Sequence, residues 1–243
     1  MTTMESTEDI RNLDDKVAIS QTDKRYLKVK RLFGVLLGIP AFLFLFPFGV
    51  IISIIIFLDD PYGGSPIFFQ NRIGKDMKKF KCVKFRTMKE DAPHNQATNS
   101  FVGAEYHITR VGKFLRKTSL DELPQLWNII KGDMALVGPR PLILSETDVH
   151  EKRRIQGIYS IKPGLTGLAQ IRGRDFVNND KKVDLDYQYW QNMSLSLDLK
   201  IILGTIGKVI KMEGIVDSTK HIDTLSQPYQ KTTNLPSNSD KNK

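Results

Sequence analysis

The chain has 243 residues, 40% of them hydrophobic, which suits one good-sized globular domain with appendages. Its formal charge of +9 indicates an anionic partner, and nucleic acid, anionic lipid and phosphorylated substrates all fit. A single cysteine, Cys82, excludes an internal disulfide and gives no support to a cysteine-ligated metal site. The four histidines lack the paired spacing of zinc sites, so carboxylates, arginines and lysines are left to carry any chemistry.

Both ends of the chain are polar and lack apolar periodicity, which predicts disorder. The beginning does not resemble a signal peptide, because the apolar run comes late and no small-residue cleavage site follows it. We therefore expect a disordered stretch over residues 1–24, a membrane helix over 25–58, a folded domain over 59–220 and a disordered tail over 221–243.

The run from Leu32 to Leu58 contains no charged residue and is long enough to cross a bilayer, for which about 20 residues suffice. Pro40 and Pro47 lie inside it, and a helix from Leu32 to Pro47 would rise only about 22 Å, short of a hydrocarbon core of ~30 Å. Both flanks are basic, so a spanning helix would put one basic cluster on the wrong side of the membrane. This favours a re-entrant helical hairpin that turns at Pro47, with a kinked spanning helix as the alternative.

Two short segments after the apolar run, Pro66–Gln70 and Phe80–Met88, are typical of strands around a turn at Gly74. Their basic residues, Lys84 and Arg86 among them, fit a solvated face as well as contacts with phosphates or lipid headgroups.

The segment RKTSLDELPQLWNIIKGDMALVGPRP predicts a helix that begins near Asp121 and ends at Gly132. Apolar residues recur there at helical spacing, so we expect one face to pack inward, formed by Leu123, Leu126, Trp127 and Ile130.

Asp121 and Glu122 meet the start of this helix. As structural residues, Ser119 and Glu122 fit a capping box, or Asp121 is itself the N-cap. A cap needs one carboxylate, however, and this site has two beside Arg116. In a frayed first turn both carboxylates can reach one hard cation, and an aspartate can also attack phosphorus. We expect the helix N-terminus to depress the pKa of both groups.

Arg140 stands between Pro139 and Pro141, which restrict its backbone on either side. This pattern fits a rigid turn with an exposed arginine, or an arginine preset to bind phosphate oxygens. The turn-rich loop 163–174 is similar, because its glycines permit close backbone approach and Arg174 adds charge.

A helical stripe near the end of the chain is more typical of a core face, although a basic amphipathic helix can also lie at a membrane interface. Its members are Leu199, Ile202, Leu203, Ile206, Val209 and Ile210.

With these motifs the chain resembles the bacterial sugar transferase family, the monotopic polyprenyl-phosphate phosphoglycosyl transferases. The resemblance covers about Lys30 to Met212, and its markers are KRLF, Pro47, FFQNRIG, KFRTM, TSLDELPQLWNIIKGDMALVGPRP and PGLTGLAQIRGR. Three positions depart from common family residues: Phe46 stands where a serine is frequent, Gly34 where an aspartate is frequent, and Leu168 where a tryptophan is frequent.

The resemblance implies a small, helix-rich α/β catalytic domain on the cytoplasmic face of a bacterial cell membrane. A re-entrant membrane helix hairpin and interfacial amphipathic helices would attach it to the inner leaflet. Lys30 and Arg31 match headgroup contacts in the family, and with Pro47 they form the implied membrane anchor.

The resemblance also implies a reaction, in which a UDP-sugar gives its sugar-1-phosphate to undecaprenyl or another polyprenyl phosphate and releases UMP. This step initiates exopolysaccharide, capsule or glycoconjugate assembly. Asp121 would form a covalent phospho-sugar, and Glu122 would help activate the polyprenyl phosphate or, with Asp121, hold Mg²⁺. The implied phosphate-binding residues are Arg116, Arg140, Lys84, Arg86 and Arg174. The positive charge then needs no nucleic acid, and a homodimer is allowed.

Two other classes of protein fit the same residues. One is a non-catalytic, membrane-anchored adaptor that binds anionic lipid or nucleic acid, and the other is a phosphatase or nucleotidyl hydrolase that uses the same carboxylates. No residue in the sequence identifies the sugar.

Overall fold

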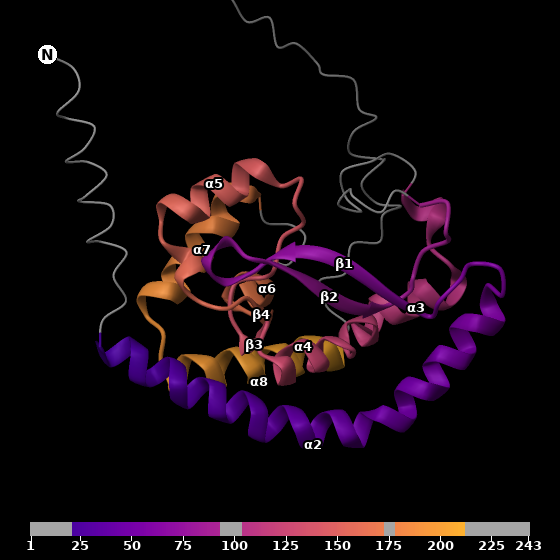
Figure 1. Cartoon of the computed structure of the whole chain (residues 1–243), viewed down its shortest axis with the longest axis horizontal. Helices are drawn as coiled ribbons and strands as arrows, with labels where there is room; N and C mark the ends of the chain where they lie inside the picture. The colour runs from indigo at the N-terminus through magenta and orange to yellow at the C-terminus, as the bar shows by residue number, and fades with distance from the viewer. Residues whose placement is uncertain (1–20, 93–103, 173–177, 212–243) are drawn as a thin grey trace, which may run out of the picture.

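The computed structural model describes residues 21–92, 104–172 and 178–211. Arg174 and both segments expected to be disordered, apart from the last four residues of the first one, lie outside these ranges. Within them the chain forms a helix-rich domain with two small sheets, and one long apolar helix lies along its side (Figure 1).

The apolar helix α2 runs without interruption from Gln21 to Asp59, 39 residues in all. It continues through Pro40 and Pro47 and bends into a shallow arc around the domain (Figure 1). Each proline removes a backbone N–H and pushes on the preceding turn, which bends a helix. The expected hairpin at Pro47 is therefore not seen. The bend is spread along a continuous helix, which begins four residues before the expected boundary.

The inner side of α2 carries glycine residues where the helix contacts the domain. A β-carbon added at Gly34 or at Gly38 would lie 3.7 Å from a side-chain atom of Ile129, and one at Gly49 would lie 3.6 Å from Phe85. These glycines bring the helix backbone close to the domain.

The outer side of α2 is exposed and apolar. Large side chains open to solvent include Leu36, Leu37, Leu43, Phe44, Phe46, Phe48, Ile51, Ile54, Phe57 and Leu58. Among the described residues, α2 is the one helix long and apolar enough to cross a membrane, and very little of its apolar stretch is buried. A core helix of a soluble protein would instead be covered on most sides.

The first part of α2 is fixed to two helices at the end of the chain, α7 (Asn179–Gln191) and α8 (Leu195–Lys211). The Lys30 ammonium lies 2.7 Å from the Asp198 carboxylate, to which Tyr26 and Tyr189 donate hydrogen bonds of 2.6 and 2.7 Å. The Lys30 side chain is only 10% exposed. Lys30 is therefore held in an internal ion pair, and the headgroup contact that the family resemblance implies for it stays a prediction.

Arg31 also faces the domain. Its guanidinium donates to the carbonyl of Ile129 and, at 2.7 Å, to that of Ile130 at the end of α4 (Gln125–Lys131). The last carbonyls of a helix lack partners within the helix and carry partial negative charge, so an arginine is well suited to them. Arg31 therefore completes the end of α4, and the headgroup contact that the family resemblance implies for it also stays a prediction.

The far end of α2 is fixed to the same domain. The carboxylate of Asp59 accepts a hydrogen bond of 3.1 Å from the amide of Val111, and the carbonyl of Asp60 accepts one of 2.9 Å from Arg86. The Arg86 side chain is buried there, 3.9 Å from the Asp60 carboxylate. Both ends of the apolar helix thus return to one domain.

The two sheets each have two strands. The predicted hairpin is confirmed, with β1 (Ile67–Ile73) antiparallel to β2 (Lys79–Phe85) around the short helix η1 (Lys75–Met77). In the second sheet β3 (Ala135–Val137) lies parallel to β4 (Gly164–Thr166). A β-carbon on Gly164 would lie 2.1 Å from the Gly138 nitrogen, so the backbones meet where only glycine fits.

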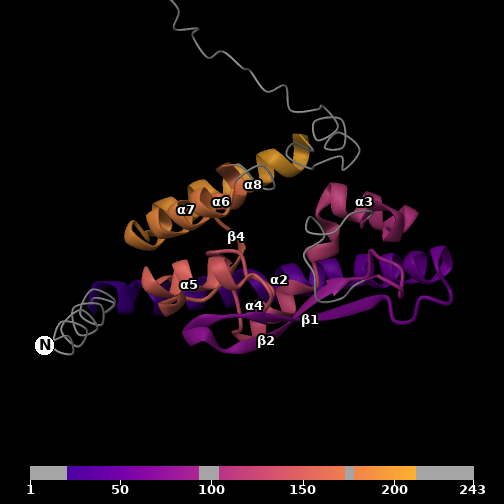
Figure 2. The same cartoon turned by 90° about the horizontal axis from the view of Figure 1, so that it is seen from above.

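The remaining elements pack around these sheets (Figure 2). They are η3 (Ala104–His107), α3 (Arg110–Thr118), η4 (Leu120–Glu122), α5 (Thr147–Ile155), η5 (Ile158–Ser160) and α6 (Leu168–Arg172). One core cluster joins β3, α6, α7 and α8, and another joins β2 and α4 to the inner side of α2.

Most of the stripe on α8 does not form the core, contrary to the prediction, although Ile202 packs against a core cluster. Leu199, Leu203, Ile206 and Val209 are exposed, whereas Ile201, outside the stripe, is fully buried. Figure 1 shows α8 and α2 along the same edge of the domain, and both helices carry exposed apolar side chains. This edge is an apolar surface of the kind that a membrane interface covers.

The Lys30–Asp198 pair gives a stability prediction. Asp198→Asn leaves a buried ammonium without its counter-charge and should lower the free energy of unfolding by about 3 kcal/mol. The double variant Lys30→Met with Asp198→Leu should recover much of that loss, because both charges are removed. Chemical unfolding in detergent measures both.

Asp180→Asn serves as the control, because Asp180 is 72% exposed in its pair with Lys152 and should contribute well under about 1 kcal/mol. Equal losses in Asp198→Asn and Asp180→Asn would contradict a buried attachment of α2.

Candidate active site

The two candidate carboxylates lie in a tight turn between α3 and α4. Helix α3 ends at Ser119, whose φ of 60° places it in the left-handed region, and Asp121 and Glu122 follow in η4. The Ser119 side chain makes no capping hydrogen bond to η4, and α4 begins only at Gln125, after Pro124. The capping box and the Asp121 N-cap are therefore not the arrangement adopted. The predicted end of α4 is confirmed, since Gly132 has a φ of 101°.

Helix α4 is held against β2 by a buried polar side chain. The Oδ1 atom of Asn128 accepts from the amide of Val83 at 3.0 Å, and its Nδ2 donates to the carbonyl of Lys81 at 2.8 Å. The inward face therefore includes Asn128 with Ile129, while Trp127 is half exposed, contrary to the predicted face. A buried amide with matched partners fixes the position of the carboxylate turn relative to β2.

Glu122 is the centre of a compact charge cluster. Its Oε1 atom lies 3.0 Å from the Lys84 ammonium on β2 and 2.8 Å from the Arg140 guanidinium. Asp121 Oδ2 is 4.0 Å from the same Lys84 ammonium. The structure thus brings together four of the residues predicted from the sequence, namely Lys84, Asp121, Glu122 and Arg140.

The two carboxylates have opposite pKa shifts. Burial raises the pKa of Asp121 and the charge of Glu122 adds to this, while Lys84 and then Arg116 offset only part of the rise. Burial also acts to raise the pKa of Glu122, but Arg140 and Lys84 outweigh it and hold that pKa well below its ordinary range. The expected common depression is therefore right for Glu122 and wrong for Asp121.

Two other arginines donate hydrogen bonds to backbone carbonyls of the loop that carries Arg140. Arg153 on α5 donates to the Arg140 carbonyl at 2.8 Å, and Arg72 on β1 donates to the Pro141 carbonyl at 2.9 Å. Arg153 also forms a fully buried ion pair with Asp186 on α7. A buried arginine pair can fix a loop by satisfying its carbonyls, so the Arg140 side chain starts from a defined backbone.

The remaining predicted phosphate ligands differ in position. The Arg116 Nε atom donates to the Thr87 hydroxyl at 2.9 Å, and its charge acts on Asp121. Arg86 is buried against Asp60 at the end of α2, and it contacts neither carboxylate of the cluster. Arg174 lies outside the described residues.

The carboxylates also bear on metal binding. Among the described residues, no group of three or more His, Cys, Asp or Glu side chains could hold a metal ion. Two adjacent carboxylates nevertheless suit Mg²⁺, which is commonly bound by one or two carboxylates together with waters and substrate phosphates. Both cations contact Oε1 of Glu122, which leaves its Oε2 and the Asp121 carboxylate as the fitting donor set.

Similar proteins carry sugar transferase names. The UDP-galactose-lipid carrier transferase of Erwinia amylovora is 43% identical over 175 residues, 66% of this chain and 36% of that protein. The exopolysaccharide production protein ExoY of Rhizobium meliloti is 40% identical over 199 residues, 76% of this chain and 87% of that protein. The undecaprenyl-phosphate galactose phosphotransferase of Salmonella typhimurium is 39% identical over 166 residues, 63% of this chain and 35% of that protein.

The chain thus spans about a third of the Erwinia and Salmonella proteins and most of ExoY. The model of the family described as Bacterial sugar transferase matches residues 25–212, which include α2, the charge cluster and α8. This match covers most of the chain, so the protein belongs to the bacterial sugar transferase family.

Proposed function

We propose that this protein transfers a sugar-1-phosphate from a UDP-sugar to a polyprenyl phosphate and releases UMP. Undecaprenyl phosphate is the acceptor in the name of the Salmonella relative, and the ExoY relative is named for exopolysaccharide production. The product would be a polyprenyl diphosphate sugar that initiates polysaccharide assembly.

The observation that supports this proposal most strongly is that two adjacent carboxylates are paired unequally with cations. Glu122 is held by Lys84 and Arg140, whereas Asp121 lies no closer than 4.0 Å to Lys84 and has a raised pKa. A carboxylate that is desolvated and only weakly paired is a better nucleophile than one held in two ion pairs. Asp121 is therefore the attacking group.

The reaction has two displacements at one phosphorus. An oxygen of Asp121 attacks the phosphorus that carries the sugar, the bond from that phosphorus to the bridging oxygen breaks, and UMP leaves with the electron pair. An oxygen of the polyprenyl phosphate then attacks the same phosphorus, and the acyl-phosphate bond breaks to restore the Asp121 carboxylate. Both nucleophiles react in their ionised forms, and each step transfers the phosphoryl group without transfer of a proton.

Glu122 serves to position cations in this scheme. Its lowered pKa makes it a weak base at neutral pH, but it orients Lys84 and Arg140 toward the space beside Asp121. Their charges would stabilise the phosphoryl oxygens as the bond to UMP breaks. Bound Mg²⁺, held by Asp121 and Glu122, would neutralise part of the diphosphate charge.

The membrane arrangement follows from α2 and α8. We infer that the apex of the α2 arc dips into one leaflet and that both its ends stay on the cytoplasmic side, a re-entrant course without a tight turn. Support comes from the exposed apolar outer side of α2, from its two attachments to one domain and from basic residues near both ends. A lipid acceptor would then reach the site from the bilayer.

The proposed reaction predicts that UMP release depends on both substrates. Purified protein with Mg²⁺, undecaprenyl phosphate and a panel of UDP-sugars that includes UDP-galactose should release UMP. Asp121→Asn should reduce the rate by roughly a thousandfold or more, because the nucleophile is removed.

Asp184→Asn, which changes an exposed carboxylate on α7, should leave the rate unchanged. UMP release at the full rate without lipid would indicate a hydrolase. A folded protein that releases no UMP with any nucleotide sugar would indicate an adaptor, and either result would overturn the proposal.

The opposite pKa shifts predict opposite effects on stability in EDTA. Because the folded pKa of Asp121 is raised, its ionised form destabilises the fold above the ordinary value of about 3.9, and Asp121→Asn should raise the free energy of unfolding at pH 7.5. This advantage should shrink as the pH falls through the raised value, since the wild-type group then takes up its proton.

Glu122→Gln should have the opposite sign. The lowered pKa of Glu122 contributes stability above the ordinary value of about 4.3, and this contribution is lost as the pH falls toward the folded value. Unfolding curves between pH 4 and pH 8 test both signs. If Asp121→Asn lowered the free energy of unfolding instead, Asp121 would have a structural role.

The buried Arg153 predicts a positioning effect on Arg140. Arg153→Lys cannot keep both the pair with Asp186 and the bond to the Arg140 carbonyl, so kcat/KM for the UDP-sugar should fall by about tenfold or more. Steady-state kinetics with an unfolding curve separate this effect from misfolding. The neighbouring Arg154→Lys, on an exposed pair with Glu151, should change neither kcat nor KM. An effect confined to stability would assign Arg153 to the fold alone.

A further inference from the structure

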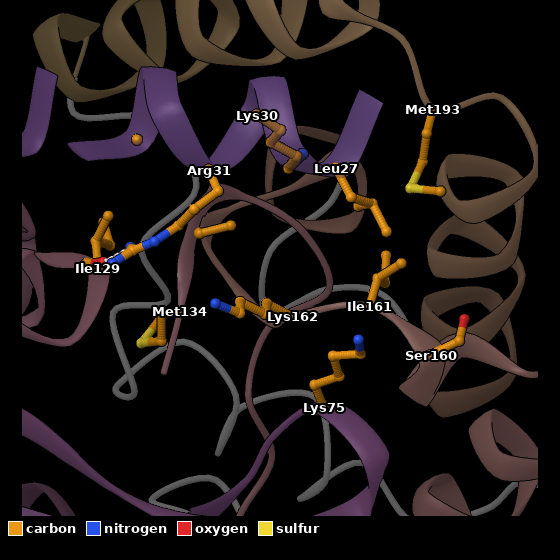
Figure 3. Close-up of a pocket in the computed structure, with 12 residues that line it drawn as sticks. Leu27, Lys30, Arg31, Lys75, Ile129, Met134, Ser160, Ile161, Lys162 and Met193 are labelled. Carbon is orange, nitrogen blue, oxygen red and sulfur yellow. Dashed lines mark hydrogen bonds between the residues drawn. The ribbon is translucent and has the colours of Figure 1, made fainter. Parts of the chain in front are cut away.

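A cavity lies away from the charge cluster, between the first part of α2 and the domain (Figure 3). Its volume is about 90 Å³, and it shares no lining residue with the cluster of Asp121, Glu122, Lys84 and Arg140. Apolar side chains form much of its wall, namely Leu27, Ile129, Met134, Ile161 and Met193. The proposed transfer reaction makes no use of it.

Four cationic residues line this pocket, and two are already engaged. Lys30 is paired with Asp198, and Arg31 binds the carbonyls at the end of α4. The other two are Lys75 from η1 and Lys162 from the segment before β4, and neither has an ion pair or side-chain hydrogen bond within the described ranges. In Figure 3 the Lys162 amine extends toward Arg31, whereas the Lys75 amine points toward the other side of the pocket, near Ile161.

The positive charge here is crowded and poorly balanced. A β-carbon added at Gly132 would lie 3.3 Å from the Arg31 guanidinium and 3.5 Å from the Lys162 ammonium. The two cations are therefore close to each other. Burial, followed by the charges of Arg31 and Lys75, lowers the pKa of Lys162, and Asp133 offsets only part of this. The Asp133 carboxylate also forms an ion pair with the Lys131 ammonium, at 3.2 Å.

Such an arrangement favours an anion. Like charges held close together in a partly desolvated space repel one another, and a bound counter-charge removes that repulsion. Lysine ammonium groups bind phosphate as point charges and adapt to different phosphate geometries. The cavity has room for several waters, at roughly 10–15 Å³ for each water centre, and hence for one phosphoryl group.

The backbone around the two lysines supports a built site. Lys75 begins a turn in which Asp76 and Met77 have φ values of 55° and 58°, a conformation that non-glycine residues adopt at a cost. Lys162 precedes Pro163, whose carbonyl accepts a hydrogen bond from the amide of Ala135 at the start of β3. Both lysines therefore extend into the lining of the pocket from constrained backbone.

We propose that this pocket is a second anion site, in which the Lys162 ammonium binds a phosphomonoester or phosphodiester group and Lys75 adds positive charge from the same lining. Arg31 adds to the positive electrostatic potential in the pocket and keeps its hydrogen bonds to the carbonyls of α4. The ligand is either the headgroup of an anionic lipid beside the first turns of α2 or a soluble phosphate. The site is independent of the chemistry at Asp121, so its failure and the failure of the transferase proposal are distinguishable.

The test is acylation of lysines in the full-length protein, read residue by residue by mass spectrometry. One arm compares nanodiscs of phosphatidylcholine with nanodiscs that also contain phosphatidylglycerol, and the other adds inorganic phosphate in neutral detergent. Bound phosphate should slow acylation of Lys75 and Lys162 by about threefold or more, because an ion pair that raises an amine pKa by about half a unit reduces the free amine by that factor.

Lys78 and Lys81 are the controls, since both are exposed on the same hairpin and neither lines the pocket. Protection of Lys75 and Lys162 with phosphatidylglycerol alone would identify a lipid headgroup, and protection with inorganic phosphate would identify a site open to solution. Equal protection of Lys78 and Lys81, or no protection in either arm, would overturn the proposal. Asp121→Asn should leave the protection unchanged.

Discussion

Both ends of the apolar helix α2 are attached to the same domain, and the rest of the arrangement depends on this constraint. Lys30 enters a buried network with Asp198 near one end, and the Asp60 carbonyl is held by Arg86 at the other. A helix with two fixed ends on one body can bend away from that body, and α2 does so as an arc (Figure 1). Its outer side is apolar and exposed, and α8, which lies along the same edge of the domain, also carries exposed apolar side chains.

The same contacts connect the apolar helix α2 to the charge cluster. Arg31 on α2 completes the end of α4, and Asn128 on α4 fixes that helix to β2, which carries Lys84. The carboxylate turn directly precedes α4, so Glu122 meets Lys84 and Arg140 at a position set by these bonds. Within this cluster two cations neutralise one carboxylate, and Asp121 is left desolvated and weakly paired. That division suits a nucleophile beside a residue that orients cations.

The sequence predicted the elements that depend on local signals. The hairpin around Gly74, the end of α4 at Gly132 and the meeting of Asp121, Glu122 and Arg140 in one site were all foreseeable from spacing, turn residues and family motifs. The direction of a side chain was not. Nothing in the sequence indicated that Lys30 and Arg31 bind groups within the domain. The α8 stripe was predicted to face the core and is mostly exposed, because a sequence pattern shows a face but not what covers it. Arg153 gave no signal, since a buried arginine in a basic helical segment resembles a solvated one until Asp186 is placed beside it.

The most direct test of this account is the side of the membrane on which each end of α2 lies. Lys24→Cys and Tyr62→Cys place thiols on exposed residues just inside and just beyond the helix, while the native Cys82 is buried. Intact cells treated with a membrane-impermeant maleimide should leave both thiols unlabelled, and inverted membrane vesicles should label both. Labelling of one position from each side would show a spanning helix and would contradict the account.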